Sequence, residues 1–163
     1  MNKINFLFVT LFGIGKLKII PGSFASLVTT LFLFLLFHVL NFSPNMVLIG
    51  VIIIFLISLY AVNIFIKDLD NKDPREIVID EFIGQSIPIS LYEIAHDGAK
   101  ETNQVLTSYF IMFILFRIFD IIKPYPVSYY DKNFKNSFGV IMDDVAAGLY
   151  VVAILVLYMI FSS

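Results

Sequence analysis

The feature that most constrains this chain is a series of long apolar runs. At a rise of about 1.5 Å per residue, roughly 20 helical residues cross the hydrocarbon layer of a bilayer. The chain has 163 residues, of which 59% are hydrophobic and only 15% charged, whereas soluble domains carry about 25% charged residues. We therefore expect a single all-α domain over residues 1–163, folded as a polytopic membrane helical bundle. The runs that suit spanning helices are Ser23–Leu40, Met46–Ile66, Val105–Ile122 and Val140–Phe161.

A fifth stretch, Ile77–Tyr92, is apolar apart from Asp80, Glu81 and a few small polar residues. It contains Gly84 and Pro88, so we expect it to be short, kinked or re-entrant. With the four longer runs it gives about five membrane segments.

The positions of lysine and arginine decide whether the fifth stretch crosses the bilayer. If it does not cross, the basic residues on its two flanks are divided between the two sides of the membrane. If it crosses, almost all of them share one side and only Lys100 lies opposite. The positive-inside rule favours crossing, with the N-terminus in the cytoplasm and the C-terminus outside. The residues then on the cytoplasmic side are Lys3, Lys16, Lys18, Lys67, Lys72, Arg75, Lys123, Lys132 and Lys135.

The first residues, Met1–Ile14, combine Lys3 with an apolar run, as a secretory signal does. However, Lys16 and Lys18 stand between this run and any cleavage site near Ser23, where a signal peptide is normally uncharged. We expect the segment to be retained as a helix lying at the membrane interface.

The predicted topology brings acidic residues of three segments to one membrane level. Asp80 and Glu81 fall at the cytoplasmic start of the third segment, and Asp120 falls at the cytoplasmic end of the fourth. Asp143 and Asp144 fall at the start of the fifth. An ionised side chain costs about 2.5–3.5 kcal/mol at the centre of a span, and neighbouring carboxylates repel each other strongly at low dielectric. A cation is therefore expected among them.

The chemistry of these residues favours a hard cation. The chain has no cysteine and only two histidines, and carboxylate ligands alone suit Mg²⁺ or Mn²⁺. Glu76 precedes Asp80 by one helical turn and shares its face if that helix begins early enough. A simpler interpretation is open for any single acid pair, since carboxylates at a helix start interact with its dipole. Convergence from three segments favours the metal site.

Two further features of the same membrane level suit phosphate. Gly22 and Ser23 begin the first span, with Ser23 predicted at the N-cap, and helix N-terminal amides bind phosphate readily. Lys123 lies beside Asp120, and Arg117 precedes that acid by one turn. Taken alone, these features also fit an ordinary helix cap and an interfacial anchor. The net charge of −2 and the lack of a basic stripe argue against a nucleic-acid partner.

Four blocks of the sequence resemble the bacterial phosphatidylglycerophosphatase A family. Residues 75–84 (REIVIDEFIG) resemble its IVxDEFxG signature, and residues 116–126 (FRIFDIIKPYP) resemble FRxxDxxKPxP. Residues 131–148 (DKNFKNSFGVIMDDVAAG) are similar to D…GxGxMxDDxxAG, and residues 20–26 (IPGSFAS) to APGTxGS. The blocks keep the family's order over nearly the whole chain, although Ala25 replaces a glycine and Asn136–Ser137 a glycine pair.

The resemblance implies a multi-pass enzyme of the bacterial inner membrane that acts at the cytoplasmic leaflet. Its reaction would be Mg²⁺-dependent hydrolysis of phosphatidylglycerophosphate to phosphatidylglycerol and phosphate, within phospholipid biosynthesis. On this hypothesis the metal ligands are Asp80, Glu81, Asp143 and Asp144, with Glu76 and Asp120 as further ligands or supports. Phosphate would be bound by Gly22, Ser23, Arg117 and Lys123, and Asp120 or Asp131 would orient or deprotonate the attacking water.

Two other functions would also use acids within a membrane. A phosphotransferase acting on a cytidine-linked lipid needs Mg²⁺ and clustered aspartates, but its D-x-x-D-G…A-R pattern does not occur in this sequence. A divalent-cation transporter would place carboxylates near the bilayer midplane and on both access routes, whereas the acids here are predicted at one edge.

Overall fold

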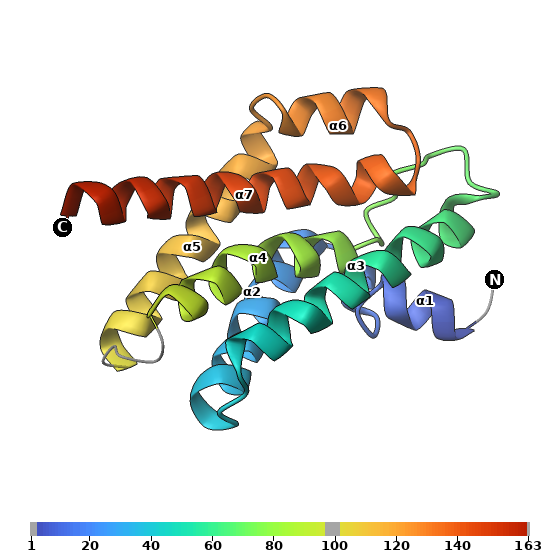
Figure 1. Ribbon diagram of the computed structural model, residues 1–163. Helices are drawn as coiled ribbons and strands as arrows, with labels where there is room; N and C mark the ends of the chain where they lie inside the picture. Colours follow the sequence, from blue (N-terminus) through green and yellow to red (C-terminus); the bar gives the residue numbers. More distant parts are fainter. Residues whose placement is uncertain (1–2, 97–101, 163) are drawn as a thin grey trace.

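The computed structural model describes residues 3–96 and 102–162 as a bundle of helices (Figure 1). Lys100, the basic residue expected on the outer side, lies outside these ranges. The elements are α1 (Lys3–Val9), the short 3₁₀ helix η1 (Ile14–Lys16), α2 (Pro21–Phe34), the π-helical η2 (Leu35–Val39), α3 (Pro44–Ile66), α4 (Ile79–His96), α5 (Thr102–Ile122), α6 (Val127–Asn133) and α7 (Ser137–Ser162).

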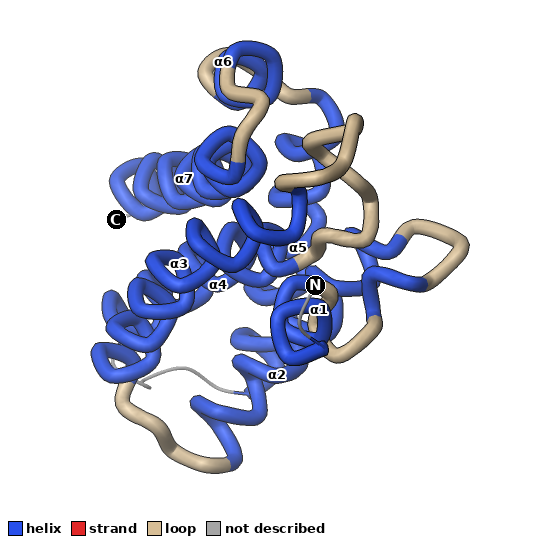
Figure 2. Tube along the Cα trace, turned by 90° about the vertical axis from the view of Figure 1, so that its right-hand side faces the viewer, coloured by secondary structure: helices blue, strands red, loops and turns tan. Residues whose placement is uncertain are grey.

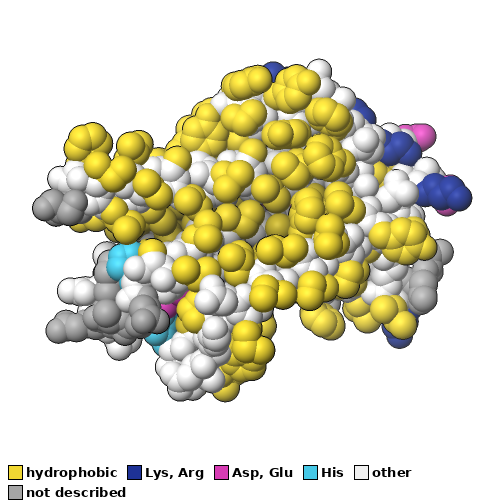
Figure 3. Space-filling model, viewed as in Figure 1, with side chains coloured by type: hydrophobic (Ala, Val, Ile, Leu, Met, Phe, Trp, Pro, Cys, Tyr) yellow, Lys and Arg dark blue, Asp and Glu magenta, His cyan; other side chains and the backbone are white. Residues whose placement is uncertain are grey.

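Four helices are long and apolar enough to cross a membrane, and they coincide with the four predicted runs. They are α2 continued by η2 (Pro21–Val39), α3, α5 and most of α7 (Ser137–Phe161). Figure 3 shows hydrophobic side chains over most of one face, with charged side chains gathered at the end where α3 leads towards α4. An exposed apolar surface of this extent requires lipid around it, so the predicted membrane bundle is confirmed.

The fifth predicted segment is α4, a continuous helix of 18 residues that runs through Pro88. It packs against α2, α3, α5 and α7, and its polar side chains Gln85, Ser86 and Ser90 are fully buried among them. A helix this polar avoids lipid because its neighbours enclose it. Its length of about 27 Å, at 1.5 Å per residue, is close to the hydrocarbon thickness.

The expected N-terminal helix is α1, which binds the end of α3 to the start of α4. Asn5 Nδ2 donates to the carbonyl of Ala61 in α3 at 3.0 Å. The amide of Val78, just before α4, donates to the carbonyl of Val9 at 3.2 Å. These two hydrogen bonds fix the position of the start of α4 along the axis of α3.

A buried polar cluster joins three helices at the other end of the bundle. Tyr109 Oη of α5 donates to Glu93 Oε1 of α4 at 2.9 Å. His38 Nε2, in the π-helical turn that ends the first span, lies 3.3 Å from the same oxygen. These contacts hold α4 in place at the end opposite to Asp80 and Glu81.

The short helix α6 lies alongside α7, as Figures 1 and 2 show. It reverses the chain between α5 and α7 and so brings the end of α5 close to the start of α7. Residues of these two ends meet in the site described next.

Candidate active site

Three buried or half-buried carboxylates meet where α4 and α7 pack together. Asp80 and Glu81 lie in the first turn of α4, and Asp144 lies two turns into α7. One oxygen from each of the three lies within 4.8 Å of the others. The approach depends on small residues, because a Cβ at Gly84 would be only 2.6 Å from the carbonyl oxygen of Asp144. Gly148 meets the carbonyl of Gly84 in the same way.

Arg117 connects α5 to this acidic cluster. Its Nη2 atom lies 2.9 Å from Asp120 Oδ2, one turn further along α5. Its Nη1 atom donates to Ser26 Oγ of α2 at 3.3 Å. Gly22, at the start of α2, stands between Arg117 and Glu81, where any side chain would collide with Glu81 Oε1. The Arg117–Asp120 ion pair and the Glu81 carboxylate therefore lie close to each other, on either side of Gly22.

Lys123 forms the second cationic position, just beyond the end of α5. Its Nζ atom lies 2.8 Å from Asp131 Oδ1 and 2.8 Å from Asp143 Oδ2. Burial on its own would lower the pKa of Lys123, but Asp143 and Asp131 outweigh burial and hold the pKa above its ordinary value. Burial likewise tends to raise the pKa of Asp131, but the hydrogen bond and charge of Lys123 bring it below the usual range. Both groups are therefore held in their charged forms.

The start of α2 differs from the prediction in one detail. The helix begins at Pro21 with Ile20 as its N-cap, so Ser23 occupies the third helical position and not the N-cap. Proline at the first helical position, with φ already suited to a helix, favours this earlier start. The first amide bonded to the preceding turn is that of Phe24, which donates to the carbonyl of Ile20 at 3.1 Å. The amides of Gly22 and Ser23 remain available to another acceptor.

A single cavity of about 350 Å³ joins these groups. Its lining mixes anionic, cationic and backbone groups, which suits an anionic group bound together with a cation. Nine of the predicted site residues line it: Gly22, Ser23, Asp80, Glu81, Arg117, Asp120, Lys123, Asp143 and Asp144.

The structure does not bring the other two predicted residues into this cavity. Helix α4 begins only at Ile79, so Glu76 lies in the preceding turn, where its carbonyl packs closely against Gly15. Asp131 does not line the cavity and reaches it only through Lys123. Asp143 lines the cavity but pairs with Lys123, outside the group of three clustered acids.

Sequence reasoning missed six residues of the lining. Asp73 and Arg75 come from the loop between α3 and α4, whose path no periodicity predicts. Arg75 did stand in one of the matching blocks, directly before Glu76. The cavity is also lined by four apolar residues, Ile20, Pro21, Ile77 and Ile121. Their side chains gave no signal for a site built from charges.

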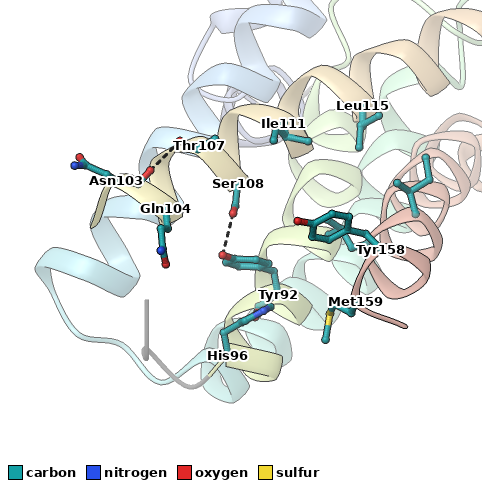
Figure 4. Close-up of a pocket in the computed structure, with 12 residues that line it drawn as sticks. Tyr92, His96, Asn103, Gln104, Thr107, Ser108, Ile111, Leu115, Tyr158 and Met159 are labelled. Carbon is teal, nitrogen blue, oxygen red and sulfur yellow. Dashed lines mark hydrogen bonds between the residues drawn. The ribbon is translucent and has the colours of Figure 1, made fainter. Parts of the chain in front are cut away.

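A larger cavity of about 660 Å³ lies between α4, α5 and α7, towards the opposite end of the bundle (Figure 4). Its described lining includes Tyr92, whose hydroxyl donates to Ser108 Oγ at 3.0 Å. That described lining contains the imidazole of His96 beside hydroxyl, amide and apolar side chains, but no carboxylate, lysine or arginine. Of these two cavities, as the described residues line them, the smaller one carries the carboxylates and the basic side chains.

Comparison with known proteins identifies the family of this chain. The family model of phosphatidylglycerophosphatase A matches residues 7–159. A Haemophilus influenzae protein named phosphatidylglycerophosphatase A is 32% identical over 154 residues, covering 94% of this chain and 87% of the relative. The Escherichia coli protein of the same name is 32% identical over 148 residues, covering 88% of this chain and 77% of the relative.

A Bacteroides thetaiotaomicron protein, named provisionally as a phosphatidylinositol-3-phosphatase, is 31% identical over 141 residues, covering 85% of this chain and 83% of the relative. No solved structure matches the chain. The family match spans α1 to α7 and includes every residue that lines the charged cavity. The chain therefore belongs to the phosphatidylglycerophosphatase A family and is a phosphatase.

Proposed function

We propose that this phosphatase hydrolyses the phosphomonoester of phosphatidylglycerophosphate, releasing phosphatidylglycerol and inorganic phosphate. The observation that carries the proposal is the meeting of three clustered carboxylates, two cations and the open amides of α2 in one cavity. The names of the Haemophilus and Escherichia relatives support the choice of lipid.

The donor set fits a magnesium ion held by Asp80, Glu81 and Asp144. All three offer carboxylate oxygens, the ligands that this hard cation prefers. Glu81 Oε2 is buried and has no hydrogen-bond partner among the described residues, so an oxygen is left for a ligand. When bound, the metal would polarise the phosphate and lower the pKa of a water molecule.

The basic residues and α2 are suited to bind the phosphate group itself. Lys123 and Arg117 enter the cavity from the end of α5. Arg117 Nε is buried without a partner among the described residues, which leaves a donor for a phosphate oxygen. The amides of Gly22 and Ser23 add backbone donors at the positive end of a helix dipole. These groups would stabilise the negative charge that develops on the phosphate oxygens during the reaction.

In the proposed reaction a water oxygen attacks phosphorus and the bond from phosphorus to the glycerol oxygen breaks. The leaving oxygen gains a proton, supplied in the overall reaction by the attacking water, and becomes the hydroxyl of phosphatidylglycerol. Asp120 is better placed than Asp131 to orient the water, because Asp120 lines the cavity and Asp131 does not. Arg117 fixes the Asp120 carboxylate through their ion pair at 2.9 Å.

The basic residues in the sequence support a cytoplasmic position for this site in the bacterial inner membrane. Lys67, Lys72 and Lys132 lie in the described segments that flank the cavity end of the bundle. By the positive-inside rule, that end faces the cytoplasm. The phosphatidylglycerol product would then enter phospholipid biosynthesis in the inner leaflet.

The direct test measures phosphate release by the purified protein in detergent micelles with phosphatidylglycerophosphate, with and without Mg²⁺. We expect activity to require Mg²⁺ and to fall about 100-fold or more in Asp80→Asn and Asp144→Asn, since metal assistance contributes several kcal/mol. Asp68→Asn, in an exposed loop position, is the control and should retain full activity. Near-normal release by either cavity variant would disprove the scheme.

The same assay addresses the head group. Phosphatidic acid and phosphatidylinositol 3-phosphate, the second suggested by the Bacteroides relative, serve as competing substrates. We expect the highest kcat/KM with phosphatidylglycerophosphate. A preference for either competitor would keep the phosphatase chemistry and replace the substrate.

A further inference from the structure

Two exposed isoleucines stand at the edge of the charged cavity, whose lining also includes Pro21 and the buried Ile77. Ile20 precedes α2 and Ile121 belongs to the last turn of α5, and both side chains line the cavity with the acids. They are 65% and 70% exposed, respectively. A cavity built only for a water-soluble phosphate would have no need of apolar side chains at its edge. From these two residues we infer that the cavity opens sideways into the bilayer, between the start of α2 and the end of α5.

The conformation of Ile20 supports this role. Its φ of 43° and ψ of 53° lie in the left-handed region, which β-branched residues avoid. Such conformations persist where surrounding structure imposes them, and they gather at functional sites. Here the conformation allows a left-handed turn to lead directly into Pro21 and the amides of Gly22 and Ser23. The apolar edge and the phosphate-binding amides therefore belong to the same few residues.

An apolar surface continues from each isoleucine into the membrane. On α2, exposed apolar side chains follow Ile20 at successive intervals of four, three and four residues, which places them on one face of the helix. On α5, such side chains precede Ile121 at successive intervals of three and four residues, again on one face. These side chains are Phe24, Leu27 and Leu31 on α2, and Ile118 and Ile114 on α5.

The occupant that fits this arrangement is the diacylglycerol part of the substrate phospholipid. Its phosphomonoester would lie among the acids and cations, and its glycerol ester region would pass between Ile20 and Ile121. The acyl chains would then follow the exposed faces of α2 and α5 within the bilayer. This inference rests on the proposed function and extends it by naming the residues that select a lipid over a soluble phosphate.

The chain provides a closely matched control for each residue. Ile19 and Ile122 are the adjacent isoleucines, 77% and 69% exposed, and neither lines the cavity. The variants Ile20→Ser and Ile121→Ser are therefore compared with Ile19→Ser and Ile122→Ser. The substrates are diacyl phosphatidylglycerophosphate in micelles and glycerophosphoglycerophosphate, which carries the same head group without acyl chains.

We expect Ile20→Ser and Ile121→Ser to raise KM for the diacyl substrate about tenfold, as loss of about half of an isoleucine's burial energy would. Their kcat should stay within about twofold of the unmodified protein, because the reacting groups are untouched. The soluble head group should be hydrolysed equally by all four variants. Equal effects at Ile121 and Ile122, or equal losses with both substrates, would overturn the inference.

A second measurement does not depend on catalysis. Phosphatidic acid with a photoreactive acyl chain is cross-linked to the unmodified protein, and the labelled residues are identified by mass spectrometry. We expect labelling at Ile20, Ile121 and the faces beyond them, reduced by excess phosphatidic acid but not by phosphatidylcholine. If the protein hydrolyses no lipid yet shows this pattern, the proposed function fails and the lateral opening stands. Labelling that is uniform over the four isoleucines and unaffected by phosphatidic acid would overturn the opening.

Discussion

Lys123 forms ion pairs with two particular acids, a pairing that the sequence alone does not reveal. The sequence predicted Asp80, Glu81, Asp143 and Asp144 as metal ligands of equal standing, because spacing along a helix says nothing about which cation each one will meet. In the fold, Lys123 forms ion pairs with Asp143 and Asp131. Arg117 forms an ion pair with Asp120. The acids that remain clustered are Asp80, Glu81 and Asp144. Residue types at the site were thus predictable from the sequence, but their pairing was not.

The Lys123–Asp131 pair predicts a pH dependence of stability. The pKa of Asp131 is lowered in the fold, so its ionised form stabilises the fold above the unfolded pKa of about 3.9. This stability is lost as the pH falls through the lower, folded pKa. Asp131→Asn should therefore unfold at a lower temperature than the unmodified protein at pH 6, and the difference should vanish towards pH 2.

The measurement is thermal unfolding in detergent with a chelator present, so that metal binding does not contribute. The effect at pH 6 should be at most about 1 kcal/mol, as for other partly exposed ion pairs. Asp68→Asn is the control and should show no such pH dependence. A difference between Asp131→Asn and the unmodified protein that persists unchanged at pH 2 would contradict the prediction.

At the scale of elements, lipid made the helices predictable and left the connections undetermined. A span must satisfy its backbone hydrogen bonds internally, so an apolar run of sufficient length has few alternatives to a helix. The loop between α3 and α4 has no such constraint, which explains why Asp73 and Arg75 were missed and why Glu76 was expected in a helix that starts later. The sequence also did not predict the close approach of α4 and α7, because that approach depends on the packing of Gly84 against Gly148.

That approach makes the site sensitive to a single methyl group. Gly84→Ala places a Cβ 2.6 Å from the carbonyl oxygen of Asp144, so α7 must move and carry Asp144 away from Asp80 and Glu81. We expect a loss of about 1–3 kcal/mol in stability, as overpacking usually costs, together with loss of activity. Gly50→Ala is the matched control, because no heavy atom lies within 4 Å of its added Cβ.

Thermal unfolding and phosphate release of these two variants provide the check. Gly50→Ala should be neutral or more stable, since alanine favours a helix by about 1 kcal/mol over glycine. Full activity in Gly84→Ala would show that the helices can separate without disturbing the acids.

At the scale of the whole molecule, the distribution of basic residues predicts which end of the bundle faces the cytoplasm. The chain contains no cysteine, so single cysteines report their own accessibility without background. Asn41→Cys lies in the turn between the first two spans, while Asp70→Cys and Lys132→Cys lie at the cavity end. In intact cells, a membrane-impermeant maleimide should label position 41 and should label positions 70 and 132 only after permeabilisation. Labelling of position 132 from outside would reverse the orientation of the site.

The partnership of α4 with α7 also has a consequence for biosynthesis. Asp80 and Glu81 are synthesised with α4, but Asp144 arrives later, on α7, which also packs against α4. Until that helix is inserted, a growing chain has the amides of α2 and the cations of α5 but an incomplete set of acids. We therefore expect phosphate release to begin only after α7 has been inserted, so that activity reports the assembly of α4 with α7.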